Sequence, residues 1–195
     1  MQSGPPHGEI RGSTVGIVGL GRVGQEVARR AAVFGCRVIA ANRTLRPPDR
    51  GVARVYALSQ LDDMLPLCDF VALCMALGPE TEGLIDARRV ALMKPSAFLV
   101  NIARGAVLDE DAVYAALRDR EIGGAALDVW WQYPDTAEAE RHPSRYPFHE
   151  LPNVIMTPHC SGWTEGMVAR RWAEVAANIN RFVRGEPLQN IVART

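Results

Sequence analysis

The chain has 195 residues, of which 48% are hydrophobic and 23% are charged, with 22 basic and 22 acidic side chains. This balance is typical of a globular domain with one sizeable core and leaves no basic surplus for nucleic acid. No apolar run is long enough to span a membrane, and the first nine residues lack the hydrophobic centre of a signal peptide. We therefore expect a cytoplasmic protein without nucleic-acid or membrane partners.

The cysteines carry no metal-binding pattern. Cys36, Cys68, Cys74 and Cys160 form no CxxC pair and show no zinc-like spacing. We expect reduced, mostly buried thiols and no metal site.

Short apolar runs alternate with helical stretches along the chain. Strands are predicted over Thr14–Val18, Val38–Ala41, Asp69–Cys74, Phe98–Asn101, Ala125–Val129 and Val154–Met156, with a weaker candidate near Arg54–Tyr56. Helices are predicted over Gln25–Phe34, Leu58–Leu65, Asp86–Met93, Asp109–Asp119 and Glu165–Val183. This alternation predicts an α/β fold with a doubly wound parallel sheet, covered by helices on both faces. Residues 131–152 lack periodicity and are predicted to form a functional or surface loop.

The pattern GLGRVG follows the first predicted strand and precedes the first predicted helix. In this context it is typical of a Rossmann-type dinucleotide site. Gly19 permits the sharp exit from the strand, Gly21 lets the backbone approach a pyrophosphate, and Gly24 lets helix and strand pack closely. The first turn of the following helix offers N–H groups to the phosphates, and Arg22 and Val23 of the glycine turn are further expected cofactor contacts. The alternative interpretation is a structural turn without a ligand.

The end of the second predicted strand bears on the choice of cofactor. A cofactor without a 2′-phosphate usually meets an acidic side chain at this position, but the chain has Asn42 there. Arg43, with Arg46 nearby, can form charge-assisted hydrogen bonds to a 2′-phosphate, and Thr44 lies in the same turn. We therefore expect NADP in preference to NAD. The alternative is that both arginines are merely solvated in a loop.

Longer motifs carry a resemblance to a known family. In chain order they are GSTVGIVGLGRVG, LGPETEGLI, LMKPSAFLVNIARGAVLDEDAV, GGAALDVW and LPNVIMTPH. In this order and spacing the chain resembles the cofactor-binding domain of the D-isomer-specific 2-hydroxyacid dehydrogenases, a family that includes glyoxylate/hydroxypyruvate reductases, phosphoglycerate dehydrogenases and formate dehydrogenases. The resemblance implies an NAD(P)-dependent oxidoreductase that transfers hydride between the nicotinamide and a small 2-hydroxy or 2-oxo acid.

The resemblance also implies a division of the chain. Members of the family have a second, flavodoxin-like substrate domain, which this sequence lacks. Residues 1–13 are expected to be a leader or linker from that domain, 14–162 the dinucleotide-binding domain, and 163–195 a helix and tail that would return to the substrate domain. A homodimer is expected, because RRVALMKPSAF and DVWWQYP offer apolar surface near the family's contact.

Three catalytic positions follow from the resemblance. Arg104 would bind the substrate carboxylate through its planar guanidinium and polarise the carbonyl. His159 would donate a proton to the carbonyl oxygen as hydride arrives. The family usually pairs this histidine with a glutamate, but the aligned residue here is Tyr133, a neutral phenol that can orient the ring and cannot stabilise its charge. Glu150 is a second candidate for the missing carboxylate.

Formate dehydrogenases have a similar pattern, DVW followed by an uncharged glutamine, and their reaction needs no proton transfer to or from a substrate hydroxyl. Three functions therefore stay open. The first is a 2-hydroxyacid dehydrogenase of the glyoxylate/hydroxypyruvate type, the second is formate-like hydride transfer without acid–base help, and the third is a redox-sensing or inert module that binds the nucleotide without turnover.

The remaining expected cofactor contacts also come from the resemblance. Asp128 would hydrogen-bond the nicotinamide carboxamide. Further contacts are expected from small or apolar residues in loops that follow strands, namely Ala76, Leu77, Thr81, Ile102 and Ala103. Trp130 and Trp131 are candidates either for shielding the nicotinamide or for a place in the core or an interface.

Overall fold

The computed structural model of the protein describes residues 8–45, 47–49, 51–134 and 142–191. The chain divides into two compact units, Met1–His159 and Cys160–Thr195. The first unit contains a sheet with its helices, and the described part of the second, up to residue 191, contains one helix. None of the helices in the described ranges combines the length and the apolar character that crossing a bilayer requires.

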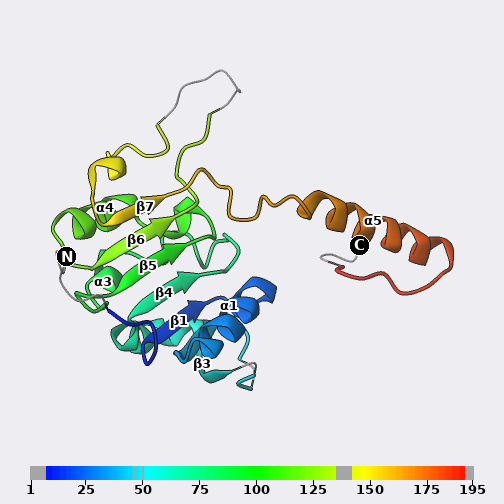
Figure 1. The fold of residues 1–195 in the computed structure, drawn as a ribbon, viewed down its shortest axis with the longest axis horizontal. Helices are drawn as coiled ribbons and strands as arrows, with labels where there is room; N and C mark the ends of the chain where they lie inside the picture. Colours follow the sequence, from blue (N-terminus) through cyan, green and yellow to red (C-terminus); the bar gives the residue numbers. More distant parts are fainter. Residues whose placement is uncertain (1–7, 46, 50, 135–141, 192–195) are drawn as a thin grey trace, which may run out of the picture. The chain divides into compact units, whose positions relative to one another are not determined.

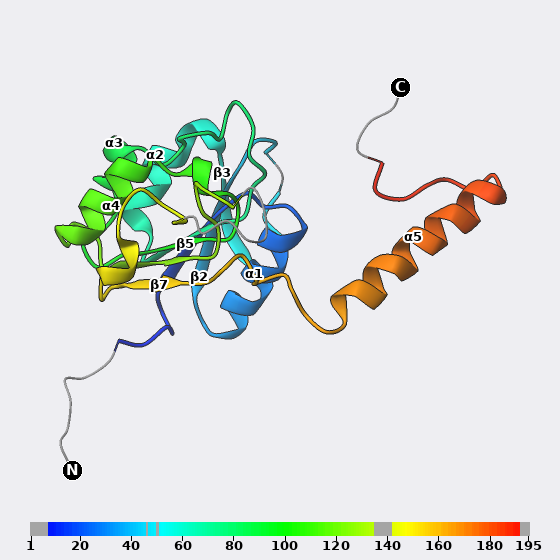
Figure 2. The same cartoon turned by 90° about the horizontal axis from the view of Figure 1, so that it is seen from above.

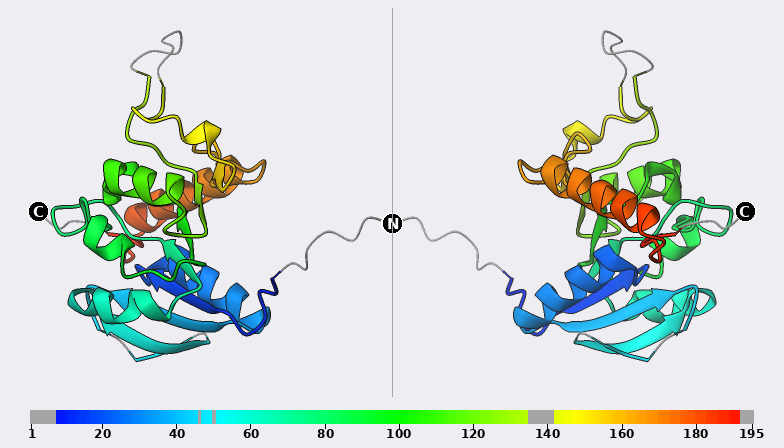
Figure 3. Two further views of the ribbon diagram at one scale, coloured as in Figure 1. Left: turned by 90° about the vertical axis from the view of Figure 1, so that its left-hand side faces the viewer. Right: turned by 90° about the vertical axis from the view of Figure 1, so that its right-hand side faces the viewer.

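In the described part of the first unit, seven strands form one sheet in the order β3-β2-β1-β4-β5-β6-β7, with every neighbouring pair parallel (Figure 1). The strands are β1 (Thr14–Val18), β2 (Arg37–Asn42), β3 (Val52–Ala57), β4 (Phe70–Leu73), β5 (Phe98–Asn101), β6 (Gly124–Leu127) and β7 (Val154–Met156). In Figure 3 the blue and cyan first half of this sheet lies below its green second half. The strand order reverses between β1 and β4, which makes this the switch point of the sheet.

Helices cover both faces of the sheet, as Figure 2 shows. The helix on one face is α1 (Arg22–Val33), and those on the other are α2 (Leu61–Met64), α3 (Ala87–Val90) and α4 (Glu110–Arg118). Ala28 of α1 packs with Val15 and Ile17 of β1, whereas Leu117 of α4 belongs to a second apolar cluster with Leu99 of β5. The predicted doubly wound parallel sheet is therefore confirmed.

Local sequence explains where elements begin and end. Strands β1, β5 and β7 have the predicted boundaries, and the weak candidate strand became the full edge strand β3. The helix predicted over Leu58–Leu65 is wrong as a single element: it is a 3-10 turn (Leu58–Gln60), then α2, then a second 3-10 turn (Leu65–Leu67). Pro66 contributes to this break, because proline lacks the N–H that an α-helix needs.

The predicted loop over residues 131–152 contains a further turn that the sequence did not reveal. This is the 3-10 turn η4 (Phe148–Glu150), and its Phe148 is completely buried. The Phe148 ring stacks on Trp131 at a centroid distance of 5.5 Å and meets the edge of Trp130 at 6.2 Å. Residues 135–141 of this segment lie outside the described residues.

The apolar segments expected at a dimer contact mostly belong to the core. Val90, Met93, Ala97 and Trp130 are all buried within the first unit. Phe98 and Tyr133 of the same two segments are exposed, at 43% and 41%, so the segments offer some apolar surface but less than expected. The homodimer itself stays a prediction.

The second unit consists mainly of the helix α5 (Met167–Val183), which begins two residues later than predicted. Asn178 on this helix accepts a hydrogen bond from the backbone N–H of Gln189 and donates one to its carbonyl oxygen, at 3.0 and 2.9 Å. These two bonds hold the segment after the helix against the helix.

Candidate functional site

The predicted site residues gather at the carboxyl edge of the sheet. Because all seven strands in the described residues are parallel, their carboxyl ends meet at one edge. Gly19 follows β1, Asn42 ends β2, Arg104 follows β5, Asp128 follows β6, and His159 follows β7. Open α/β sheets bind their ligands in the crevice at this edge.

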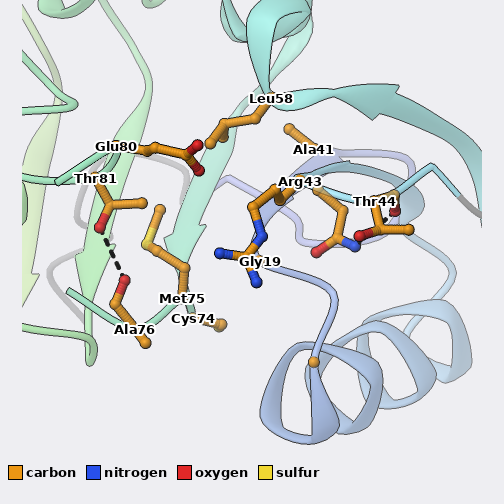
Figure 4. Close-up of a pocket in the computed structure, with 12 residues that line it drawn as sticks. Gly19, Ala41, Arg43, Thr44, Leu58, Cys74, Met75, Ala76, Glu80 and Thr81 are labelled. Atoms are coloured by element: carbon orange, nitrogen blue, oxygen red, sulfur yellow. Dashed lines mark hydrogen bonds between the residues drawn. The ribbon is translucent and has the colours of Figure 1, made fainter. Parts of the chain in front are cut away.

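A pocket of about 330 Å³ lies at the switch point, between the ends of β1, β2 and β4 (Figure 4). The predicted residues that line it are Gly19, Gly21, Asn42, Arg43, Thr44, Ala76 and Thr81. Leu58, Cys74, Met75 and Glu80 also line it, and motif spacing alone did not single them out. The structure does not place Arg22, Val23, Leu77, Ile102 and Ala103 in this lining.

The three glycines of GLGRVG meet different surroundings. Gly19 has a φ of 95°, and a Cβ there would lie 2.7 Å from the backbone nitrogen of Met75. A Cβ on Gly24 would lie 2.1 Å from the carbonyl oxygen of Gly19, so glycine is required where α1 packs on the turn. A Cβ on Gly21 would have no atom within 4 Å.

That open side of Gly21 allows a ligand to approach the backbone closely. The first turn of α1 carries no acidic side chain, so its positive dipole end is not neutralised locally. These features fit the pyrophosphate of a dinucleotide, and this fit rests on the surroundings of Gly21 rather than on the motif alone.

Asn42 holds the glycine turn in place. Its Oδ1 accepts a hydrogen bond from the backbone N–H of Leu20 at 3.1 Å, and its Nδ2 donates to the carbonyl oxygen of Thr44 at 2.8 Å. Arg43 is exposed, and Figure 4 shows its side chain extending into the pocket with Glu80 on the opposite wall. Arg46, the second arginine expected here, lies outside the described residues.

The loop after β4 is closed by the hydroxyl of Thr81. Its Oγ1 donates to the carbonyl oxygen of Ala76 at 2.9 Å and accepts from the backbone N–H of Gly78 at 2.8 Å (Figure 4). Burial raises the pKa of the neighbouring Cys74 thiol to about 11, so this thiol is uncharged at neutral pH. No group of side chains in the described part of the chain could hold a metal ion.

Arg104 projects from a turn that is organised by Asn101, a completely buried residue at the end of β5. The Asn101 side chain accepts from the backbone N–H of Ala103 at 3.0 Å and donates to the carbonyl oxygen of Arg104 at 2.9 Å. The Arg104 side chain is exposed, and its Nη1 donates to the carbonyl oxygen of Ala103 at 2.6 Å. The backbone is thus held firmly while the guanidinium stays at the surface.

His159 and Tyr133 face each other in a second pocket, of about 610 Å³. The Tyr133 hydroxyl lies 3.1 Å from Nδ1 of His159, and the backbone N–H of Trp130 donates to the same hydroxyl at 3.1 Å. The other lining residues are Trp130, Gln132, Pro134, Pro143, Met156, Thr157 and Pro158. None of the described lining residues is a carboxylate. Glu150 lies in η4, where its carboxylate is 4.0 Å from Nε2 of His149, and it is not part of this lining.

Asp128 is buried beside this second pocket, with 4% of its surface exposed. Its Oδ1 accepts a hydrogen bond of 2.6 Å from the Thr157 hydroxyl. The indole N–H of Trp130 donates to the carbonyl oxygen of Thr157 at 2.9 Å, so Trp130 belongs to the core at this point. These bonds join the end of β6 to the end of β7.

Comparison with known proteins identifies the family to which the chain belongs. Residues 1–161 match the description of the D-isomer specific 2-hydroxyacid dehydrogenase, NAD binding domain. The chain belongs to this family. Over 186 residues it is 40% identical to a glyoxylate reductase from Thermococcus onnurineus, and the match covers 95% of this chain and 53% of that protein.

Solved structures of the same family have a closely similar fold. An NADPH-dependent glyoxylate/hydroxypyruvate reductase from Sinorhizobium meliloti, in complex with NADP and sulfate, matches with a TM-score of 0.84 and 31% identity, over 97% of this chain and 58% of that one. A D-lactate dehydrogenase with NAD+ from Lactobacillus jensenii matches with a TM-score of 0.84 and 27% identity, over 98% and 60%. The chain therefore spans little more than half the length of these family members.

Proposed function

We propose that this chain is the nucleotide-binding part of a dehydrogenase that transfers hydride between NADP(H) and a small 2-oxo or 2-hydroxy acid of the glyoxylate or hydroxypyruvate type. The observation that carries the proposal is the common position of the glycine pocket, Arg104 and His159 at one edge of the sheet. The nicotinamide supplies or takes up the hydride when the cofactor is bound. The remaining substrate contacts come from a second domain, as the family resemblance implies.

The preference for NADP is supported by Arg43. Its exposed guanidinium enters the pocket where the second strand ends, and the neighbouring Asn42 brings no negative charge against a 2′-phosphate. Asn42 also keeps the turn in position, because its amide bonds Leu20 and Thr44. A planar guanidinium beside a phosphate forms charge-assisted hydrogen bonds that NAD cannot provide.

Three residues of this chain have separate roles in binding the substrate and the nicotinamide. Arg104 orients the carboxylate of the substrate, His159 contacts the oxygen next to the carbon that exchanges hydride, and Asp128 hydrogen-bonds the nicotinamide carboxamide. Trp130 lies beside Asp128 and His159 and keeps water from this end of the second pocket.

The first experiment titrates the full 195-residue chain with NADPH and separately with NADH, following tryptophan emission and energy transfer to the reduced nicotinamide. NADPH is expected to bind about tenfold more tightly, and Arg43→Ala to remove most of that difference. Arg37→Ala is the matched control, because Arg37 is an exposed arginine at the opposite end of the same strand.

The outcomes of this titration test the NADP preference and the dehydrogenase proposal separately. Equal affinity for both nucleotides in the unmodified chain overturns the NADP preference alone. The absence of a saturable signal with either nucleotide overturns the dehydrogenase proposal.

Formate-type hydride transfer is the second candidate, and the pairing of His159 with a phenol favours it. A neutral partner does not hold a proton on the imidazole as a carboxylate would. Turnover assays of the enzyme that contains this chain, with glyoxylate, hydroxypyruvate and formate as alternative substrates, decide between the candidates. Formate oxidation without reduction of the two oxo acids would select the second.

A further inference from the structure

We propose that Tyr133 holds neutral His159 in the tautomer that carries its proton on Nε2, which is the reverse of what a carboxylate partner imposes. The tautomer itself follows from geometry in this chain. Its consequence for the substrate rests on the proposed function, because it requires the substrate oxygen to meet His159.

The first step concerns the direction of the hydrogen bond. A backbone N–H can only donate, so the bond from Trp130 to the Tyr133 hydroxyl uses that oxygen as an acceptor. The hydroxyl keeps one proton to donate, and Nδ1 of His159 lies 3.1 Å away. Between a neutral phenol and a neutral imidazole, the phenol O–H is the donor and the unprotonated ring nitrogen is the acceptor. Nδ1 is therefore an acceptor, and the proton of the neutral ring is on Nε2.

The second step concerns how firmly the hydroxyl is held. Trp130 is buried and its indole N–H bonds Thr157, which fixes the backbone that donates to Tyr133. The backbone N–H of Gln132, directly before Tyr133, donates to the carbonyl oxygen of Pro143 at 3.0 Å. The backbone that leads into the phenol is thus held at two points, Trp130 and Gln132.

The histidine is constrained as well. His159 has a φ of 56°, in the left-handed region that side chains other than glycine seldom adopt. Its ring centroid lies 5.6 Å from that of Tyr133, at an interplanar angle of 50°. A backbone in this conformation, with the ring directed at the phenol, shows that the surroundings impose the orientation of His159.

In the described lining of the second pocket, no ionisable group other than the Tyr133 phenol faces the His159 ring and sets its tautomer. Within the described lining of the second pocket, Tyr133 and His159 are the residues with ionisable side chains, and Gln132 and Thr157 are polar but uncharged. Asp128 is the carboxylate next to this pocket, and the Thr157 hydroxyl donates to its Oδ1. The phenol is therefore the group that decides the tautomer.

The consequence is a change in what His159 offers to a ligand. A carboxylate partner accepts from Nδ1–H and leaves a lone pair on Nε2, so the histidine serves as a base toward an alcohol. With Tyr133 as partner, Nε2 carries a hydrogen and donates a neutral hydrogen bond. The oxygen that Nε2 binds then acts as an acceptor, as a carbonyl or carboxylate oxygen does, and Nε2 of this tautomer has no lone pair with which to take the proton of a 2-hydroxy acid's hydroxyl.

The test is the protonation pattern of the His159 ring, read from long-range proton–nitrogen correlation spectra of the ¹⁵N-labelled 195-residue chain at pH 8 without nucleotide. His159→Gln identifies the signal by removing it. We expect the unmodified chain to carry the proton on Nε2, Tyr133→Phe to shift the ring toward a mixture of tautomers, and Tyr133→Glu to move the proton to Nδ1. Tyr146→Phe is the matched control, because the Tyr146 hydroxyl bonds Asp111 and does not line the second pocket.

The inference is overturned if His159 in the unmodified chain carries its proton on Nδ1, or if Tyr133→Phe leaves the tautomer unchanged. Tyr133→Phe keeps the ring and retains the fold even where Tyr133→Glu does not. Because no nucleotide is present, a failed NADPH titration overturns the proposed function without touching this result. A proton on Nδ1 overturns the inference without touching the cofactor pocket.

Discussion

The hydroxyl of Thr157 lies 2.6 Å from a carboxylate oxygen of Asp128, and this contact joins the carboxyl ends of β6 and β7. Asp128 is buried, so its carboxylate depends on hydrogen bonds within the protein for stabilisation. The same two strands lead to Tyr133 and His159. A bond that stabilises the sheet edge therefore also positions the pair in the second pocket.

Removing that bond is expected to destabilise the fold. Thr157→Val takes away the hydroxyl that donates to the buried Asp128, and we expect the free energy of unfolding to fall by about 1–3 kcal/mol. Thr157→Ser keeps the hydroxyl and is expected to lose less. Urea unfolding followed by circular dichroism measures both variants, and a Val variant as stable as the Ser variant would contradict the prediction.

Two substitutions in the glycine turn are expected to act differently, one on the stability of the fold and the other on NADPH binding. Gly24→Ala places a Cβ 2.1 Å from the carbonyl oxygen of Gly19, and the overpacking is expected to cost about 1–3 kcal/mol of stability. Gly21→Ala meets no atom within 4 Å and has a negative φ, so its stability is expected to change by less than about 1 kcal/mol. NADPH binding is nevertheless expected to weaken in Gly21→Ala. Equal NADPH affinity of Gly21→Ala and the unmodified chain, by the same fluorescence titration, would argue against a pyrophosphate at this turn.

The segment before η4 is attached to α4 through Glu110. Its carboxylate accepts from the hydroxyl of Ser144 at 2.7 Å and from the backbone N–H of Arg145 at 3.0 Å, and it pairs with the Arg145 guanidinium at 3.1 Å. The Glu110 side chain is 10% exposed, whereas that of the adjacent Asp111 is 60% exposed. We expect Glu110→Ala to lower the free energy of unfolding by about 2 kcal/mol and Asp111→Ala by less than about 1 kcal/mol. Thermal and urea unfolding of the two variants side by side checks the order, and the reverse order would contradict it.

Asp69 is expected to make a contribution to the free energy of unfolding that is lost at acid pH. The Lys94 ammonium, which bonds its carboxylate at 2.7 Å, and then the backbone N–H of Thr14 at 2.8 Å lower the pKa of Asp69. A pKa that is lower in the folded than in the unfolded chain adds stability above the unfolded value of about 3.9, and this stability is lost as the pH falls through the lower folded value.

The corresponding variant is Lys94→Met. It is expected to be less stable than the unmodified chain at pH 7 and to differ from it less at pH 2, where a larger fraction of Asp69 is protonated. Urea unfolding at the two pH values measures the difference, and a gap that stays constant would show that Lys94 acts by packing rather than by charge.

Much of the fold could be predicted because its signals are local. Gly19 and Gly24 stand out by spacing, and the apolar runs of β1, β5 and β7 are bounded by residues that end strands. The division of the helix predicted over Leu58–Leu65 could not be read in the same way, because Pro66 lies just beyond its predicted end. The buried η4 was not visible, because Phe148 follows an aperiodic segment and is covered by Trp130 and Trp131, which stand at the beginning of that segment.

Some residues of the candidate site could likewise be identified from the sequence, and others only from the structure. Arg43, Arg104 and His159 were identified from the sequence because each follows a predicted strand within a recognisable motif. Met75 and Glu80 joined the cofactor pocket only in the structure, because their contribution depends on how the loop after β4 approaches the glycine turn.

The sequence by itself determined the alternation of strands and helices, the glycine turn and the replacement of a carboxylate by Tyr133, since these are properties of neighbouring residues. Only the tertiary structure decided that the Trp130 N–H and the His159 ring meet at the same phenol oxygen. Residues 133 and 159 are brought together by the packing of β6 against β7, and the direction of a hydrogen bond depends on where both partners are held in space.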